Sequence, residues 1–379
     1  MDFSFTEDQE AVRDLARQIL QDRADPEQLS AIERSDQGMD GELWKSLAEA
    51  NLLGVAIADE HGGSGFGFAE LCLLLEEQGR ALSPLPLLPS LVMAGLPIAE
   101  FGSSDQRSRL LPGLASGETI LSAALSEMGS SDPTRPRVTA RAESGGFRLE
   151  GEKICVPAAE LASQILVPAG TNRGEVGVFL VDPGAPGALL TREVSTNFEP
   201  QSTLALSGVA VPGEEVLGDP AQGAAIVRWI EERALTALCA IQLGVADEAL
   251  RRTAEYTSTR KQFERPIATF QGVALRAADA YIDVEAMRST LWQAVWRLDT
   301  GRPAAKEVAA ARWWACRGGQ RVAHTAQHLH AGIGSDIDYP IHRFFLWSKQ
   351  LDLTLGSAGV HQARLGAHLA SGGAVEDEA

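Results

Sequence analysis

The spacing of apolar residues divides this chain into a helical, a strand-like and again a helical stretch. Within residues 1–118, one buried helix face is predicted by apolar residues three and four positions apart, namely Val12, Leu15, Ala16, Ile19 and Leu20. Thr6 followed by Gln9 is a capping-box signal at the start of this helix. Further helices are predicted at 43–52, 68–82 and 105–111, and Pro112 is expected to end the last of them.

Residues 119–218 carry short runs of β-forming residues in place of the helical spacing. The runs cover 120–125, 138–142, 147–156, 164–167, 176–181, 189–194 and 203–206. Clusters of glycine, proline, aspartate and serine, such as the one at 182–187, separate them. Short strands at regular spacing with turn signals between them predict a β-barrel or a β-sandwich.

Long helices are predicted from residue 219 onward. Of the 18 prolines, 15 lie in residues 1–220, so the chain beyond residue 220 can carry uninterrupted helices. One apolar stripe runs through Val273, Ala277, Tyr281, Val284, Met287, Leu291, Val295 and Leu298. Six of the seven tryptophans also lie here, which favours a four-helix bundle with surface kept for a partner subunit. The predicted fold class is α+β, with an N-terminal helical domain (1–118), a central β domain (119–218) and a C-terminal bundle (219–379).

Charge and composition exclude several classes of protein. The 33 basic and 51 acidic residues leave a net charge of −18, which argues against nucleic acid or an anionic membrane as the main partner. The N-terminus lacks a signal-peptide pattern and the apolar runs are broken by prolines, so a cytoplasmic protein is expected. The four cysteines form no CxxC pair, and no carboxylate or cysteine complements His324 and His328, so no metal site is predicted.

The helix–β–helix order at this length resembles the acyl-CoA dehydrogenase family, and three strings carry the resemblance. The first is the glycine-rich stretch 53–65. The second and most specific begins at Gly244 and continues as Arg-Lys-Gln-Phe-Glu-Arg-Pro-Ile over 260–267, with Phe-Gln at 270–271. The third is His-Ala-Gly-Ile-Gly at 330–334, followed by Tyr339, Pro340 and Arg343. The strings occur in the family's order, and the resemblance covers nearly the whole chain.

The resemblance implies flavin-dependent α,β-dehydrogenation of an acyl-CoA thioester to the trans-2-enoyl-CoA. A carboxylate base removes the α-proton while FAD accepts the β-hydrogen as hydride. An electron-transfer flavoprotein is the implied electron acceptor. A homotetramer, or a heterotetramer with a homologous subunit, is the implied assembly. The residues do not identify the acyl chain, nor do they separate coenzyme A from a carrier-protein thioester.

The family's usual base position departs from the pattern. In the segment before the last helix, Leu355 stands where the resemblance places a glutamate, and leucine cannot accept a proton. Some members carry the base on the first long helix of the bundle, a position that aligns with Ala234. Glu231 and Glu232 are close by and are the candidate catalytic residues, with Glu232 preferred because of its neighbour Arg233. The alternative is that both glutamates are solvated surface residues.

The segments implied to contact the flavin ring are also altered. Cys155 and Pro157 replace a tryptophan and a threonine, which removes an aromatic wall and a hydroxyl donor. Cys155 is expected to be a small buried core residue rather than a redox thiol. In the segment 126–132, Ser126 keeps the family's serine. In the third string, His328 and Ala331 depart from the usual glutamine and glycine.

The segment implied to reach a neighbouring subunit's cofactor is kept. The candidate cofactor-binding residues are Arg260, Gln262, Phe263, Gln271, Ser126, His328 and Gly332. The Arg260 guanidinium suits a pyrophosphate, since it can form forked, charge-assisted hydrogen bonds. Two hypotheses follow: the chain is itself a dehydrogenase, or it is a catalytically silent partner subunit that completes the flavin site of a heteromeric acyl-CoA dehydrogenase. A thioester-binding protein without redox chemistry is a third reading.

Overall fold

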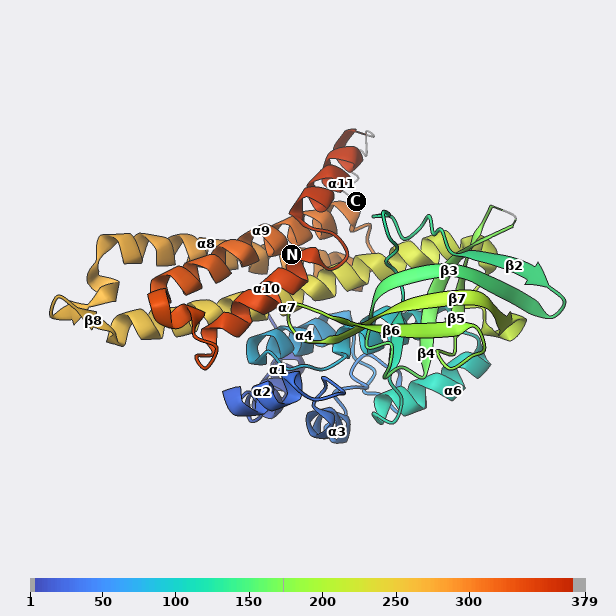
Figure 1. The fold of residues 1–379 in the computed structure, drawn as a ribbon, viewed down its shortest axis with the longest axis horizontal. Helices are drawn as coiled ribbons and strands as arrows, with labels where there is room; N and C mark the ends of the chain where they lie inside the picture. The colour runs from blue at the N-terminus through green and yellow to red at the C-terminus, as the bar shows by residue number, and fades with distance from the viewer. Residues whose placement is uncertain (1–3, 173, 371–379) are drawn as a thin grey trace. The chain divides into compact units, whose positions relative to one another are not determined.

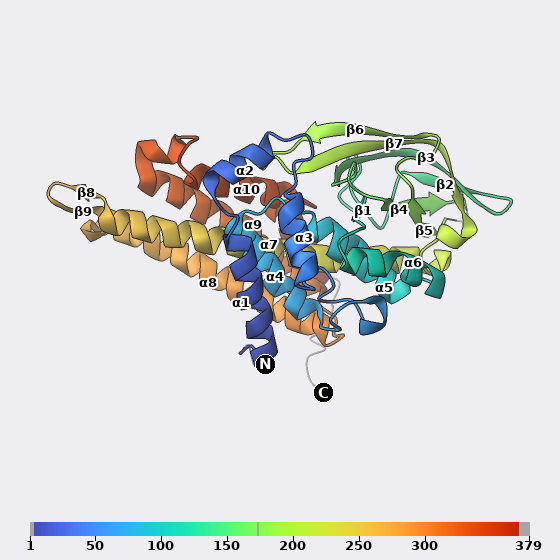
Figure 2. The ribbon, with the colours of Figure 1, turned by 90° about the horizontal axis from the view of Figure 1, so that it is seen from below.

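The secondary structure runs from helices through strands back to helices, which confirms the predicted α+β fold class. The computed structural model describes residues 4–172 and 174–370. These form two compact units, one of residues 5–75 and 83–237, and one that contains residues 76–82 and the chain from 238 onward. Helices α4 (Phe68–Ala81) and α7 (Gly223–Thr259) contribute residues to both units. Figure 1 and Figure 2 show the course of the chain in two views.

The N-terminal helices form where the apolar spacing predicts them, with additional short elements between. The capping box is present: the Thr6 hydroxyl accepts a hydrogen bond from the Gln9 N–H at 3.2 Å, and the Gln9 side chain accepts from the Thr6 N–H at 3.1 Å. Besides α4, the elements are α1 (Glu7–Gln21), α2 (Pro26–Glu33), α3 (Gly41–Glu49), η1 (Asp59–His61), η2 (Leu88–Gly95), α5 (Leu96–Phe101) and α6 (Ser104–Ala115).

Helix α6 does not end at Pro112 as the sequence predicted, but continues to Ala115. Proline removes one backbone hydrogen bond, and here burial of Leu111 and Leu114 offsets that loss. The Gln106 side chain also ties the helix to the carbonyls of Glu214 and Val216, at 2.8 and 3.1 Å. Tertiary packing therefore overrides the local helix-breaking signal.

All seven predicted strands are present in one sheet, ordered β1-β4-β2-β3-β7-β6, with β5 paired to β4. Their bounds are β1 (Leu121–Ala123), β2 (Thr139–Glu143), β3 (Gly146–Pro157), β4 (Gln164–Thr171), β5 (Val176–Val181), β6 (Ala188–Val194) and β7 (Pro200–Pro212). Strands β3 and β7 pair antiparallel with register shifts at Leu149/Glu150 and Lys153/Val156. The second shift is a bulge that removes Ile154 and Cys155 from the ladder. Two short turns, η3 (Gly213–Glu215) and η4 (Pro220–Gln222), lead into α7.

The C-terminal helices pack through the predicted stripe along only part of its length. Val284, Met287, Leu291 and Val295 are buried, whereas Tyr281 is 60% exposed, so the first third of that helix lies open in this chain. The elements after α7 are β8 (Lys261–Gln262), β9 (Arg265–Pro266), η5 (Ile267–Thr269), α8 (Gln271–Asp299), α9 (Ala305–His330), η6 (Ala331–Ser335), α10 (Ile341–Leu353) and α11 (Ala358–Ala370). None of the described helices is long and apolar enough to cross a membrane.

Two glycines allow α4 and α7 to touch backbone to backbone. A Cβ at Gly244 would lie 1.9 Å from the Glu76 carbonyl oxygen, and one at Gly79 would lie 2.0 Å from that of Ile241. Both distances are far below van der Waals contact, so only glycine fits. The contact is flanked by ion pairs from Arg80 to Glu76 and Asp247, at 3.3 and 2.7 Å. The Gly244 of the family-like string therefore has a structural reason that needs no ligand.

Candidate active site

The hairpin of β8 and β9 carries the strongest cofactor candidates on an exposed tip. Figure 1 and Figure 2 both show it beyond the ends of α7 and α8. Its two turn residues, Phe263 and Glu264, have φ of 51° and 65°, as a tight hairpin turn of this hand requires. The Arg260 N–H donates to the Tyr256 carbonyl at 2.8 Å, and the Arg260 carbonyl accepts from Ile267 N–H at 2.9 Å. The backbone of Arg260 is thus fixed on both sides.

The side chains of this hairpin point away from the rest of their unit. Arg260 and Gln262 are exposed, and Phe263 is 87% exposed. Phe263 and Phe270 meet edge to face at 6.2 Å, the Arg265 guanidinium lies 4.2 Å from the Phe270 ring, and Gln271 opens α8 in an exposed position. An exposed phenylalanine held on a turn of non-glycine residues is costly for the isolated chain, which indicates a surface that a ligand or another chain covers.

The third family-like string, at 330–334, lies at the same end of α7 as the hairpin. His330, the last residue of α9, stacks on Tyr256 near the end of α7 with ring centroids 4.4 Å apart. His328 and Gly332 are exposed, and nothing lies within 4 Å of a Cβ built on Gly332. Arg260 follows Tyr256 by one helical turn, so the structure brings the Arg260 hairpin and the Gly332 turn together. Ala331 between them adopts φ 56° and ψ −135°, a region that glycine favours.

Ser126 and Cys155 belong to the other unit, where one buried ion pair braces both segments. Glu127, next to Ser126, accepts from Lys153 Nζ at 2.6 Å and from the N–H groups of Arg137 and Val138 at 2.5 and 3.2 Å. The Ile154 N–H donates to the Ser126 carbonyl at 3.0 Å. Lys153 is fully buried, and burial lowers the pKa of its ammonium against the opposing effect of Glu127. The structure therefore brings Ser126 beside the strand segment that carries Cys155.

Cys155 is exposed, so the expectation that it is a buried core residue is wrong. The cause is the bulge in β3, which places Cys155 at φ 50° outside the ladder. Partial burial of the thiol, with a contribution from Glu193, raises its pKa, so the reactive thiolate is disfavoured. Pro157 uses its carbonyl to accept the Ser122 hydroxyl at 2.5 Å and has no N–H to offer a ligand.

The two candidate bases lie in the third turn of α7, since the helix begins at Gly223. Glu231 is buried, Glu232 is half-buried, and the aligned Ala234 is fully buried. Burial raises the pKa of the Glu232 carboxyl, while Arg233 and Arg228 oppose the shift. Arg233 itself packs on Trp229, with the guanidinium 3.5 Å from the ring centroid. Neither glutamate is the freely solvated first-turn residue of the alternative reading.

The turn that carries Leu355 contains no base, yet its backbone is tightly held. Leu355 and Gly356 have φ of 54° and 104°. The buried Arg312 side chain donates to the carbonyl of Leu351, and to that of Thr354 at 2.8 Å. His361 bonds the Gly356 carbonyl at 2.9 Å, and burial together with Arg312 lowers the pKa of its imidazole to about 3. Arg312 was missed from the sequence because one arginine in an alanine-rich helix carries no spacing signal.

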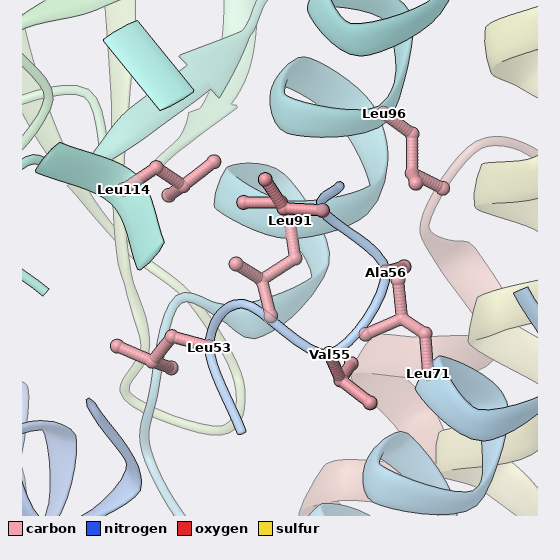
Figure 3. A pocket seen from close by; sticks show the side chains of 8 residues that line it. Leu53, Val55, Ala56, Leu71, Leu91, Leu96 and Leu114 are labelled. Carbon is pink, nitrogen blue, oxygen red and sulfur yellow. The ribbon is translucent and has the colours of Figure 1, made fainter. Parts of the chain in front are cut away.

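The remaining candidates carry no site of their own. His324 packs edge to face on Phe345 at 4.9 Å, and the described residues contain no cluster of three or more possible metal ligands. A void of about 10 Å³ lies between the N-terminal helices, about the room that one water molecule needs (Figure 3). Its lining is wholly aliphatic: Leu53, Val55, Ala56, Ile57, Leu71, Leu91, Leu96 and Leu114. No side chain in that lining can orient a polar group.

Comparison with known proteins gives matches over almost the whole chain. The model of the acyl-CoA dehydrogenase N-terminal domain matches residues 6–118, and that of the C-terminal domain matches residues 223–370. Acyl-CoA dehydrogenase FadE27 of Mycobacterium tuberculosis is 38% identical, over 98% of this chain and 99% of its own. A variant of the Tcur3481–Tcur3483 steroid ACAD has a TM-score of 0.91 at 45% identity, covering 97% of this chain and 99% of that one. A chain of the ChsE4–ChsE5 complex from Mycobacterium tuberculosis matches with a TM-score of 0.92 at 38% identity, and the match covers 100% of this chain and 100% of that one.

Proposed function

The chain belongs to the acyl-CoA dehydrogenase family, and on that premise we propose that it takes part in FAD-dependent α,β-dehydrogenation of an acyl-CoA thioester to the trans-2-enoyl-CoA. The observation that carries the proposal is the exposed hairpin of Arg260 and Phe263 beside the open Gly332 turn. One end of the helices thus offers a cation, an aromatic face and accessible backbone together. This combination suits a ligand with a pyrophosphate and a planar base.

The residues present fit the nucleotide part of FAD. Arg260 would hold the pyrophosphate through its guanidinium, and Gln271 offers both a donor and an acceptor. A Cβ on Gly332 would meet nothing within 4 Å, so this turn leaves room for a ligand against its backbone. Bound FAD supplies the acceptor for the hydride that leaves the β-carbon. The contacts implied for the flavin ring are less complete, because Cys155 and Pro157 provide neither an aromatic wall nor a hydroxyl donor.

Glu232 is the proposed base if this chain performs the chemistry itself. Its carboxyl is half-buried with a raised pKa, and a base is most effective when its pKa approaches the working pH. Arg233 and Arg228 act in the opposite direction on that pKa, so they favour the ionised carboxylate that a base must present. Glu231, which is buried one residue away, is the second candidate.

Single replacements separate the two glutamates. Glu232→Gln keeps the size and removes the base, so the rate of flavin reduction by acyl-CoA should fall about 100-fold to 10,000-fold with little change in substrate affinity. Glu231→Gln tests the second candidate in the same way: with Glu232 as the base it should change the rate less than tenfold, whereas a large fall in Glu231→Gln alone would assign the base to Glu231. Equal rates in wild type and both variants would mean that neither glutamate is the base.

A second candidate function is favoured by the contrast between the two halves of the site. The hairpin that could serve a neighbouring chain is complete and exposed, whereas Leu355 stands at the family's usual base position and Cys155 and Pro157 offer no ring wall. In this reading the chain is the partner subunit that completes the flavin site of a homologous chain. The likeness to chains of the ChsE4–ChsE5 complex, which has two different components, supports it.

Co-expression distinguishes the two candidates. The chain would be purified alone and together with a homologous chain that retains the glutamate missing at Leu355. A yellow, active protein from the single chain supports the first function. A colourless single chain that gives a yellow, active complex on co-expression supports the second. A chain that stays colourless in both preparations contradicts both.

The proposed substrate is an acyl-CoA with a steroid-type acyl group, and the proposed electron acceptor is an electron-transfer flavoprotein. The 45% identity to the steroid ACAD over 97% of this chain supports the first point. A panel of thioesters tests it, with butyryl-CoA as the small straight-chain control. We expect kcat/KM for a steroid side-chain thioester to exceed that for butyryl-CoA by at least about tenfold. A preference for butyryl-CoA would overturn the assignment.

A further inference from the structure

Three aromatic rings connect the ends of α7 and α9 with the segment before α10. His330 and Tyr256 are nearly parallel, with an interplanar angle of 22° and a centroid distance of 4.4 Å. Tyr339 packs against both, at 5.4 Å from His330 and 6.4 Å from Tyr256. Offset and edge contacts at these distances each stabilise an arrangement by about 0.5–1.5 kcal/mol. We refer to Tyr256, His330 and Tyr339 as the aromatic cluster.

His330 is held in the cluster as a neutral ring. It is 1% exposed, and Nδ1 lies 2.8 Å from the Ala326 carbonyl oxygen, so the proton sits on Nδ1. Nε2 is buried and has no hydrogen-bond partner in the part of the chain that the structure describes. Burial lowers the pKa of the imidazole, with the Ala326 hydrogen bond opposing the shift. A second proton would create a buried charge and a buried N–H without an acceptor.

The cluster lies between the two segments proposed to hold the cofactor nucleotide. Arg260 follows Tyr256 by one turn, and its N–H donates to the Tyr256 carbonyl at 2.8 Å. Ala331 and Gly332 directly follow His330, and Ala331 is held in a conformation that glycine favours. Moving His330 would therefore release the Gly332 turn on one side and the base of the hairpin on the other.

We propose that His330, through its stacking on Tyr256, is a positioning residue that fixes the Arg260 hairpin and the Gly332 turn relative to each other for a pyrophosphate-bearing ligand. The inference rests on the proposed function, since that function assigns FAD to this surface. It goes further by making the placement of both segments depend on a residue that the ligand does not touch.

The groups around the cluster leave His330 as the member that gains a proton on acidification. Tyr256 faces it from α7 and Tyr339 from the segment before α10. Arg252 and Glu255 of α7 act on Tyr339, where burial is the main cause of a raised phenol pKa. Protonation of His330 below its pKa would therefore loosen the cluster, and cofactor retention should fall with pH.

Limited proteolysis tests the positioning without any cofactor. The hairpin contains two trypsin sites, Arg260 and Lys261, both exposed, since the bond after Arg265 precedes Pro266 and resists trypsin. In the full-length chain without FAD, His330→Ala should accelerate cleavage at these sites by at least about threefold, because the ring contacts of His330 with Tyr256 and Tyr339 are both lost. His330→Phe keeps a ring of similar shape and should cleave at the wild-type rate. An unchanged rate for His330→Ala would overturn the proposal, whatever the protein's activity.

Retention of FAD by the assembled, co-expressed enzyme gives the second readout. As the pH is lowered from about 7.5, wild type should lose FAD more readily once His330 gains a proton, whereas His330→Phe should show no such loss. His324→Phe is the matched control, since His324 is an exposed histidine of the same helix outside the cluster, and it should keep the wild-type pH profile. A wild-type pH profile in His330→Phe contradicts the inference alone. A wild-type assembly that binds no FAD contradicts the proposed function and the inference built on it.

Discussion

Residues with positive φ other than glycine gather in the segments of the candidate site. Of the nine such residues in the described chain, five lie there: Cys155, Phe263, Glu264, Ala331 and Leu355. Each left-handed conformation costs a non-glycine residue about 1 kcal/mol or more, so it persists only where the surroundings enforce it. For Phe263 and Glu264 the hairpin enforces it, and for Leu355 the hydrogen bonds of Arg312 and His361 do. The strain thus marks segments whose backbone geometry is held against its own preference.

Ala331 provides the clearest test of this strain, since glycine is usual at its place in the motif. Ala331→Gly should raise the free energy of unfolding by about 1 kcal/mol, because relief of the strained φ and ψ exceeds the entropic cost of glycine. Ala278→Gly, at an exposed position within α8, is the control and should lower it by about the same amount. Chemical denaturation measures both. A loss of stability in both variants would show that Ala331 is unstrained.

Glu199 gives the residue-scale prediction for pH. Burial raises the pKa of its carboxyl to about 7, and a 2.6 Å hydrogen bond from the Asn197 amide opposes the shift. The folded state therefore holds this proton more tightly than the unfolded chain does, and its contribution to stability is lost as pH rises from about 4.5 to about 7. Glu199→Gln should remove this loss and raise stability at about pH 8 by roughly 2–3 kcal/mol.

The free energy of unfolding, measured at about pH 5 and at about pH 8, checks the sign of this pH dependence. The difference between wild type and Glu199→Gln should be small at the lower pH and large at the higher one. Glu143→Gln, at an exposed carboxyl on β2, is the control, and its free energy of unfolding should change with pH with the same slope as in wild type. If Glu199→Gln keeps that slope as well, the Glu199 carboxyl is solvated in the folded protein.

At the scale of elements, the sequence predicts best where one local pattern decides the outcome. All seven strands were found because β-forming runs and turn clusters alternate regularly, and α1 begins at its capping box. The end of α6 was missed because buried packing outweighs Pro112. The exposure of Cys155 depends on a bulge, which is set by pairing with β7 and leaves no local signal. Long-range contacts likewise decided the positions of Arg312 and His330.

Gly244 shows how an element contact explains a residue of the family-like string. Gly244→Ala would place a methyl group 1.9 Å from the Glu76 carbonyl oxygen and force α4 and α7 apart. We expect a loss of at least about 3 kcal/mol in the free energy of unfolding, comparable to a severe overpacking substitution. Gly366→Ala in α11, where nothing lies within 4 Å of the new Cβ, should instead stabilise the helix slightly. Thermal unfolding of both variants would settle the matter, and a stable Gly244→Ala protein would contradict the contact.

For the whole molecule, the net charge of −18 and the exposed hairpin both bear on whether the chain works together with a homologous partner. Both FAD and acyl-CoA are anionic, so in the proposed function this acidic chain would bind them through local basic groups such as Arg260. Those groups lie on an exposed hairpin, whereas Leu355 occupies the family's usual base position. This is the arrangement that the second candidate function expects of a chain that completes a site in a neighbour.

Flavin content tests this division in the co-expressed complex. If only the homologous chain has a complete ring pocket, the complex should hold about one FAD for two chains, because each site combines one pocket with one hairpin. Arg260→Ala in this chain should reduce that content, since the pyrophosphate loses its charge-assisted partner. Arg276→Ala, an exposed arginine nearby on α8, is the control and should leave the content unchanged. A complex with one FAD for every chain, insensitive to Arg260→Ala, would mean that this chain binds its own flavin and that its hairpin serves no partner.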